Sequence, residues 1–266
     1  MYSRVIATLR AAEMRVTNDD LAARLRVDGI ETSDEWIRTR TGILERRFAD
    51  AQKGETTTSL AVAAARNALE RSGLRAEEID LIIVATTTPD MVFPSTAAHV
   101  QSAIGATGCA AFDVQAVCAG FIYALNAADA MLRAGPYRSA IVIGAEVMSR
   151  VLDFKDRSTC VLFGDGAGAW CFRAPRTPGV LAARMYADGR YDEKVLGLTA
   201  RIDNGAVVGC PYINMDGRQV FKARGGGTRQ FRQRSRRSCL RRTEDVALFV
   251  PHQANLRIMK HGRQEA

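Results

Sequence analysis

The sequence predicts an α/β protein, because short apolar runs that suit buried strands alternate with helical patterns along the chain. Residues 56–72 form an alanine-rich helical pattern that ends at Gly73, a residue type that commonly terminates helices. Residues 79–84 follow as a nearly continuous apolar run, which is typical of a strand covered on both faces of a sheet. These two segments are the clearest helix and strand of the chain.

The alternation continues along the chain. Further helices and strands are expected in the order helix, strand, helix, strand, strand, over 95–104, 110–114, 121–133, 140–144 and 160–163. Residues 77–84 and 244–251 also resemble each other, since each is an acidic turn followed by an apolar run, and 246–250 is therefore expected to be a buried strand. A fold made of two similar halves would produce this repetition.

The composition excludes several classes of protein. With 266 residues and an apolar content of 47%, the chain can form a sizeable core and is not disordered as a whole. No run approaches the roughly 18 apolar residues of a membrane helix, and the N-terminus lacks the pattern of a signal peptide. We therefore expect a cytoplasmic protein that does not act at a membrane. Six cysteines without a C-x-x-C pair predict neither a disulfide framework nor a metal site.

The net charge of +8 is concentrated in one segment. Residues 222–243 hold nine lysines and arginines and no acidic residue, so the other 244 residues carry a net charge of −1. The segment has no helical or strand periodicity, although a helix is expected between two strands at this point. Its charge leaves nucleic-acid binding open as an alternative, with Phe231 as the one interleaved aromatic residue that could stack on a base.

Cys118 is the candidate nucleophile. The residues around it predict a strand, a tight turn and then a helix, and a thiolate near a helix N-terminus is stabilised by backbone amides and the helix dipole. His252 is expected just past a buried strand, and the two residues together suggest a Cys–His pair. Both also have an interpretation as ordinary structural residues. The glycine-rich run 164–168 matches no phosphate-binding motif and is better explained by tight backbone packing beside a strand.

Five segments together resemble one enzyme family, β-ketoacyl-[acyl-carrier-protein] synthase III, which starts bacterial fatty-acid synthesis. They are 33–43, 112–121 around Cys118, 156–159, 163–168 and 250–258. The similarity extends over 1–8, 14–222 and 243–259, which is 234 of the 266 residues. It implies an α/β, thiolase-like fold with two similar halves, here 1–175 with the nucleophilic cysteine and 176–266 with the catalytic histidine, the second half being incomplete.

The resemblance also implies the reaction and the partners. The family condenses an acyl group from acyl-CoA, expected here to be acetyl-CoA, with malonyl-acyl-carrier protein, and releases CoA and CO2. It implies a homodimer that binds no nucleic acid and needs no cofactor, because the CoA thioester is a substrate. A related acyl-CoA condensing enzyme of secondary metabolism and a catalytically dead fragment are the alternatives.

Roles for individual residues follow from the same resemblance. Cys118 would be the nucleophile and His252 the second catalytic residue. The substrate CoA would be bound by Thr32, Trp36, Arg40, Arg157, Gly217, Phe221 and Asn255, with Trp36 stacked between the adenine and Arg157. Phe93 would shape the acyl pocket, and Arg257 would contact the acidic carrier protein.

This sequence departs from the family pattern in several places. The third catalytic residue of the family, an asparagine, has no counterpart here, and we therefore expect a C-terminally truncated chain with impaired activity. Residues 9–13, 223–242 and 261–266 also differ from the family pattern. These segments are rich in arginine, glycine, serine and alanine, a composition that a GC-rich gene yields when it is translated out of frame. Our hypothesis is therefore that the sequence contains frameshifts.

Overall fold

The structure is a computed structural model that describes residues 6–173, 180–181, 183–189, 196–220, 247–248, 250–256 and 259. Contacts between residues divide the chain into two compact units, each made of three separate segments. The first comprises 1–15, 47–148 and 164–186, and the second comprises 16–46, 149–163 and 187–266. The resemblance predicts a different division, into two similar halves that meet at residue 175. Those halves are defined by structural similarity and the two units by contacts, so the halves remain a prediction.

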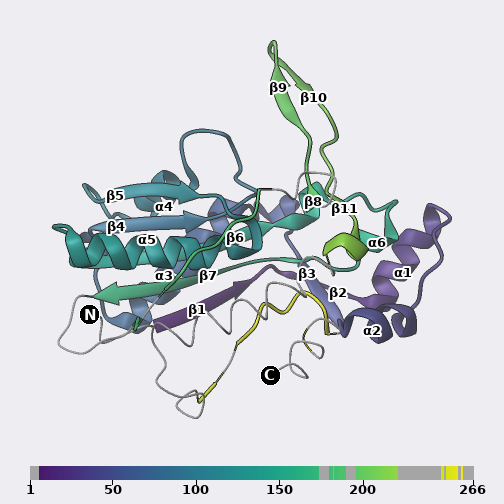
Figure 1. The fold of residues 1–266 in the computed structure, drawn as a ribbon, viewed down its shortest axis with the longest axis horizontal. Coiled ribbons are helices and arrows are strands. Elements are labelled where there is room, and N and C mark those ends of the chain that lie inside the picture. The colour runs from purple at the N-terminus through teal and green to yellow at the C-terminus, as the bar shows by residue number, and fades with distance from the viewer. Residues whose placement is uncertain are drawn as a thin grey trace. The chain divides into compact units, whose positions relative to one another are not determined.

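A five-stranded sheet forms the centre of the first unit (Figure 1). Its strands, in spatial order, are β1 (Ile6–Ala11), β7 (Asp165–Arg173), β6 (Ser139–Val147), β4 (Leu81–Ala85) and β5 (Ala110–Val114). β4 pairs in parallel with β5 and β6, whereas β7 is antiparallel to β1 and β6. Strands from distant parts of the sequence are therefore neighbours, and the carboxyl ends of β4, β5 and β6 meet at one edge.

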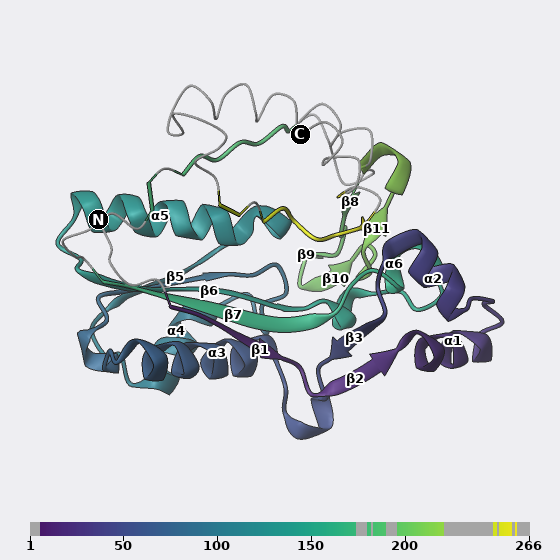
Figure 2. The same ribbon diagram turned by 90° about the horizontal axis from the view of Figure 1, so that it is seen from below.

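Helices cover both faces of this sheet. Figure 2 shows α5 (Gly120–Ala134) on one face and α3 (Thr57–Ser72) with α4 (Thr96–Ile104) on the other. Alternate residues of the central strands face the two layers, so that Ile82 packs toward α3 and α4 while Ile83 packs toward α5. Both side chains are fully buried, as the continuous apolar run predicted.

Most of the expected elements of the first unit are confirmed. α3 begins after Thr56, whose hydroxyl caps the helix, and ends at Gly73 in the left-handed conformation. α4, α5, β4, β5 and β6 lie within a few residues of their expected bounds. The glycine-rich run 164–168 contributes to strand β7, where a side chain at Gly166 would lie 3.2 Å from the carbonyl oxygen of Arg10. The expected tight packing is therefore confirmed.

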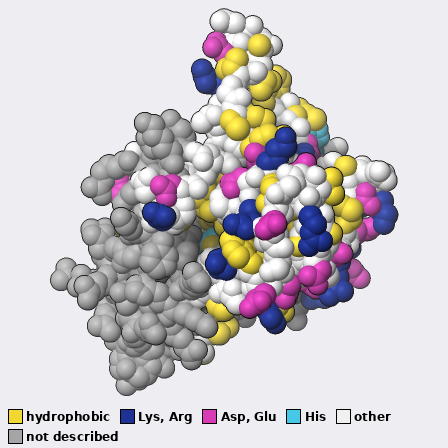
Figure 3. Space-filling view, turned by 90° about the vertical axis from the view of Figure 1, so that its right-hand side faces the viewer, with side chains coloured by type: hydrophobic (Ala, Val, Ile, Leu, Met, Phe, Trp, Pro, Cys, Tyr) yellow, Lys and Arg dark blue, Asp and Glu magenta, His cyan; other side chains and the backbone are white. Residues whose placement is uncertain are grey.

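The second unit holds a smaller core of its own. Helices α1 (Asn18–Val27), α2 (Asp34–Thr41) and the short α6 (Arg157–Cys160) surround it. The side chains buried between them are Leu21, Leu25, Ile37, Leu152, Cys160 and Val161. Among the remaining strands, β9 (Arg201–Asp203) and β10 (Ala206–Val208) form a hairpin, and β8 (Leu196–Gly197) pairs with β11 (Asn214–Met215). On the face shown in Figure 3, basic and acidic side chains of the described residues are interspersed.

Short pieces complete the described chain. β2 (Met14–Thr17) pairs with β3 (Glu45–Phe48), and the four 3-10 helices cover Ala51–Lys53, Ala76–Glu78, Val117–Ala119 and Met148–Val151. Within the described residues, no helix is both long enough and apolar enough to cross a membrane.

Two expected strands are wrong. Residues 160–163 are not a strand, because Cys160 ends α6 and Val161 begins a turn; they are apolar because they pack into the core of the second unit. The strand expected at 246–250 is contradicted where the structure describes it, since Leu248 and Val250 lie outside any strand and are 78% and 69% exposed. A strand needs a neighbour for its backbone groups, and none of the described sheets includes Ala247, Leu248 or Val250. The basic segment 222–243 lies outside the described residues.

Candidate active site

Cys118 lies on a sharp turn between β5 and α5. The 3-10 turn Val117–Ala119 separates the strand from the helix, so the thiol lies one residue before the N-cap of α5, as the sequence predicted. The thiol-bearing residue is exposed. Gly120 begins α5, and a side chain there would lie 3.3 Å from Cβ of Ala85 at the end of β4. The start of the helix is thus packed closely on the carboxyl ends of the strands.

Val117 gives this turn a strained backbone. Its φ of 48° lies in the left-handed region, which is a marked outlier for a β-branched residue. Its side chain is 53% exposed, so side-chain burial does little to offset the strain. Strained residues of this kind cluster at functional sites, where the surrounding structure holds them in place. Val117 was not among the predicted site residues, because its only signal in the sequence is a valine at a position where a turn favours glycine or asparagine.

The other described cysteines differ from Cys118. Burial raises the pKa of the Cys160 and Cys171 thiols to about 11, and burial also raises the pKa of the half-buried Cys109 thiol. Cys210 is exposed, but it lies in an irregular segment rather than at a helix start. Within the described residues, Cys118 is therefore the one cysteine that combines exposure with a helix N-terminus.

Carboxylates at the same edge of the sheet hold the loops in place. Glu146 on β6 accepts hydrogen bonds from the backbone N and the hydroxyl of Thr87, at 2.8 and 2.9 Å, and from the hydroxyl of Thr88 at 2.5 Å. Asp113 on β5 accepts two bonds, of 2.7 and 2.8 Å, from the first backbone amides of α4. The loop between these anchors carries Phe93, which is 81% exposed. Both carboxylates fix this loop, a role that the sequence analysis missed.

Trp36, Arg40 and Arg157 come together in the second unit. Trp36 lies on α2, whose N-terminus is capped by Ser33 through a 3.1 Å bond to the amide of Trp36. The guanidinium carbons of Arg40 and Arg157 lie 4.5 and 4.3 Å from the centre of the indole ring, within the range of cation–π contacts. Arg157 also donates to the carbonyl of Glu31. Two cations gathered on one aromatic ring are a combination of groups that can bind a flat, negatively charged ligand.

Thr32, Gly217 and Asn255 also belong to the second unit. The hydroxyl oxygen of Thr32 is buried and has no hydrogen-bond partner among the described residues. Gly217 is exposed and starts a helical turn, and no heavy atom lies within 4 Å of the position its Cβ would take. Asn255 is half-buried, and the residue after it, Leu256, packs against Gly42 at the end of α2. The structure thus brings the Asn255 segment to the helix that carries Trp36.

The remaining predicted residues are not joined to these groups. His252 is exposed and lies in the second unit, whereas Cys118 lies in the first, so their pairing remains a prediction. Phe221 and Arg257 lie outside the described residues.

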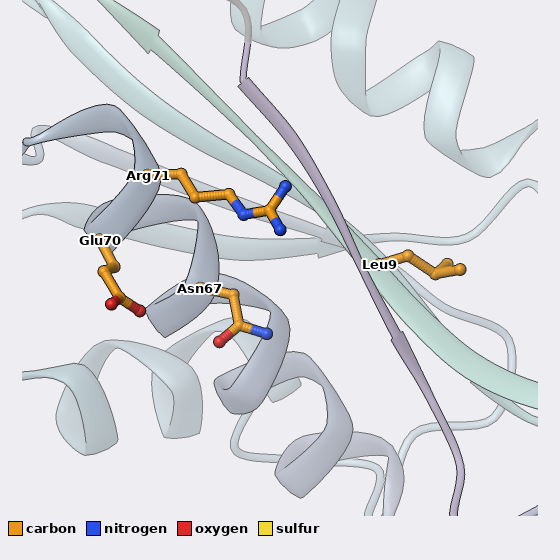
Figure 4. A pocket seen from close by; sticks show the side chains of 4 residues that line it. All are labelled: Leu9, Asn67, Glu70 and Arg71. Atoms are coloured by element: carbon orange, nitrogen blue, oxygen red, sulfur yellow. The ribbon is translucent and has the colours of Figure 1, made fainter.

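A pocket of about 520 Å³ lies elsewhere, lined by Leu9 of β1 and by Asn67, Glu70 and Arg71 of α3 (Figure 4). Because β1 and β5 are the opposite edges of the sheet, this pocket is not part of the Cys118 site.

Comparisons with known proteins agree with the resemblance. A sequence family described as 3-oxoacyl-[acyl-carrier-protein (ACP)] synthase III matches residues 112–189. A β-ketoacyl-[acyl-carrier-protein] synthase III from Bordetella petrii is 53% identical over 250 residues, which cover 93% of this chain and 74% of the relative.

Solved structures give the same result. The 3-oxoacyl-[acyl-carrier-protein] synthase III of Aquifex aeolicus is 43% identical with a TM-score of 0.82, covering 97% of this chain and 79% of that one. The priming β-ketosynthase of the R1128 polyketide pathway is 33% identical with a TM-score of 0.86, covering 97% of this chain and 76% of that one. These matches confirm the predicted α/β, thiolase-like fold. The chain belongs to the β-ketoacyl-[acyl-carrier-protein] synthase III family, the condensing acyltransferases that start fatty-acid synthesis.

Proposed function

We propose that this chain takes an acyl group, acetyl in the first instance, from acyl-CoA onto Cys118 and condenses it with malonyl-acyl-carrier protein. The observation that supports this most is that Cys118 is an exposed residue on a strained turn immediately before α5. A thiolate in this position is stabilised by the amides at the helix start. It attacks the thioester carbonyl, the CoA thiolate leaves, and an acyl-enzyme thioester forms.

In the second step the malonyl thioester loses CO2. The electrons of the broken carbon–carbon bond form an enolate, and His252 is proposed to donate a hydrogen bond to its oxygen. The carbanion carbon of this enolate attacks the acyl-enzyme carbonyl and forms a new carbon–carbon bond. The bond between that carbonyl carbon and the sulfur of Cys118 then breaks, which regenerates the Cys118 thiolate and leaves the 3-oxoacyl product on the carrier. Removing one hydrogen-bond donor to an oxygen that becomes negatively charged, as His252 is proposed to be, typically lowers the rate of the reaction by ~10²–10³.

CoA is proposed to bind at the cluster of Trp36, Arg40 and Arg157. The adenine would lie on the indole ring, and Arg40 would pair with a phosphate. Since both guanidinium groups now lie within 4.5 Å of the ring centre, one of them would move aside or share the stack. Thr32 offers its unpartnered hydroxyl to the pantetheine arm, which Gly217, Phe221 and Asn255 would also line. Phe93 would shape the acyl pocket, and Arg257 would contact the carrier protein.

The test is acetyl transfer from acetyl-CoA to the intact chain. After incubation, mass spectrometry of the peptides should find acetyl on Cys118, and the label should disappear in Cys118→Ser. Trp36→Ala should raise the acetyl-CoA concentration needed for half-maximal labelling while Cys118 remains the labelled residue. Acetyl spread evenly over several cysteines, or none on Cys118, would contradict the proposal.

A condensing enzyme of secondary metabolism is the second candidate. The observation that favours it is the TM-score of 0.86 with the R1128 priming ketosynthase. A panel of acyl-CoA primers separates the two: preference for acetyl-CoA supports fatty-acid initiation, whereas preference for a longer or branched primer supports the alternative.

We also propose that the enzyme is a homodimer. β5 ends the described five-stranded sheet, so its outer edge has backbone groups open to pairing with a second copy. Light scattering after size-exclusion chromatography measures the mass in solution, and a monomer at micromolar concentration would contradict this.

A further inference from the structure

Arg46 is a buried cation that the proposed reaction does not use. It lies on β3 and is only 6% exposed. Its guanidinium donates to the carbonyl oxygens of Val161 at 3.2 Å and of Val16 at 3.4 Å. Its Nε has no hydrogen-bond partner, and no carboxylate of the described residues forms an ion pair with it.

This arrangement is costly. A buried charge without an opposite charge loses its hydration and regains only part of it from carbonyl dipoles. Burial accordingly lowers the pKa of Arg46 below its usual range. An apolar side chain of similar volume would fill the same space at less cost. The placement of an arginine here therefore points to a role beyond filling the core.

The two carbonyls show what Arg46 holds together. Val161 is the C-cap of α6, and a cation at this end satisfies a carbonyl that the helix itself leaves open. Val16 belongs to β2. Arg46 therefore ties the end of α6 to the strand that precedes α1.

α6 has only four residues, so its position depends on such contacts rather than on its own hydrogen bonds. At its other end Arg157 is the first helical residue, and its guanidinium lies over the ring of Trp36. The Asp156 cap and the burial of Cys160 hold the helix as well, but Arg46 is the group that binds its C-terminal carbonyl. A shift of α6 would move Arg157 away from the indole ring.

We infer that Arg46 is a positioning residue for the nucleotide end of CoA: by holding α6, it keeps Arg157 over Trp36. The inference rests on the proposed CoA site. It concerns the adenine and phosphate half of the ligand, so the pantetheine arm should be bound equally well without Arg46. A residue with a purely structural role would affect both halves alike.

The experiment is calorimetric titration of the intact chain with CoA, with adenosine 3′,5′-bisphosphate and with pantetheine. Arg46→Met should weaken CoA and the bisphosphate about tenfold, which is about 1.4 kcal/mol, while pantetheine changes less than about twofold. Because methionine fills the space without a buried charge, the thermal midpoint of Arg46→Met should be unchanged or higher. Arg46→Lys, which keeps the charge but loses the forked geometry, should show a smaller loss for the same two ligands.

Arg24→Met is the matched control. Arg24 belongs to the same unit and stacks over Phe154 at 3.5 Å, but it is exposed and donates to neither carbonyl. Its replacement should leave all three affinities unchanged. Equal loss of the nucleotide and pantetheine ligands in Arg46→Met, or no loss, would overturn the inference. Should that variant not fold, Arg46→Lys decides by the same criterion.

Trp36→Ala separates this inference from the proposed site. If Trp36→Ala leaves CoA binding intact, the proposed CoA site fails and the inference with it. If Trp36→Ala weakens CoA but Arg46→Met does not, only the role of Arg46 is wrong.

Discussion

A single methyl group at Gly42 should loosen the segment that carries Asn255. Gly42 ends α2 with a φ of 79°, and a Cβ placed there would lie 2.8 Å from Cβ and 3.0 Å from Cδ2 of Leu256. Because one of the clashing atoms is the Cβ of Leu256, rotating that side chain cannot relieve the contact. The backbone on either side of Leu256 has to move.

The magnitude follows from two costs. An alanine in the left-handed conformation costs about 1–2 kcal/mol, and overpacking against Leu256 adds about 1–3 kcal/mol. We therefore expect Gly42→Ala to lower the free energy of unfolding by about 2–5 kcal/mol. The loss is smaller if the segment that carries Leu256 detaches, because detachment relieves the overpacking. Gly29 is the control, since its φ is 75° but nothing lies within 4 Å of its Cβ position. Gly29→Ala should therefore lower the free energy of unfolding only by the cost of the left-handed conformation, about 1–2 kcal/mol.

Urea denaturation measures both variants, and hydrogen exchange followed by mass spectrometry measures the segment directly. Peptides that contain Leu256 should exchange faster in Gly42→Ala and be unchanged in Gly29→Ala. If both variants lose the same stability and neither changes that exchange, the contact between Gly42 and Leu256 contributes nothing to holding the segment.

Three further predictions concern Cys118 and the edge of the sheet where it lies. Brief iodoacetamide treatment should modify Cys118 but not Cys160 or Cys171, because burial raises the pKa of those two thiols to about 11 and leaves about 1% thiolate at pH 9. Peptide mapping measures which cysteines are modified, and rapid modification of either buried thiol would contradict the prediction. Val117→Gly should raise the free energy of unfolding by about 1 kcal/mol by relieving the left-handed strain, yet slow acetylation of Cys118; an unchanged acetylation rate would show that the strain does not orient the thiol. Glu146→Gln should lower stability by about 1–3 kcal/mol in urea denaturation, since an amide cannot accept all three threonine donors that the carboxylate binds; a neutral effect would contradict the anchoring role.

The elements that the sequence predicted best are those whose signals are local. α3 has an apolar stripe at helical spacing, a threonine that caps its start and a glycine at its end, and all three features appear in the structure. β4 is apolar throughout because helices cover both of its faces. In these cases burial, capping and periodicity all favour the same structure.

The elements that sequence reasoning missed depend on distant partners. Residues 160–163 are as apolar as a strand, but four residues carry too little periodicity to distinguish a strand from the end of a buried helix. β7 begins at Asp165 with a glycine-rich stretch that looks like a loop, and it is a strand because β1 and β6 pair with it on both sides. Gly166 leaves room for the close approach of β1, where a Cβ would lie 3.2 Å from the carbonyl oxygen of Arg10, and a sequence alone does not reveal that approach.

The same distinction holds for the site. The position of Cys118 before a helix was predictable, because the strand, turn and helix are contiguous in the chain. The contact of Trp36 with Arg157 joins distant segments, and only the family resemblance indicated it. Arg46 had no signal at all, since an arginine in a short strand is normally a surface residue.

The two candidate subsites are held by different forces, and this decides how each responds to substitution. The Cys118 turn is fixed through its backbone: a strained Val117 and a glycine that lets α5 start directly against β4. The side chain of Val117 contributes little, so smaller residues at 117 should change the geometry of the thiol more than the stability of the core. The Trp36 cluster is fixed through side chains, because the indole ring, Arg157 and the buried guanidinium of Arg46 each depend on a contact that one substitution removes. Substitutions there should therefore alter ligand affinity gradually, according to how much of each contact the new side chain restores.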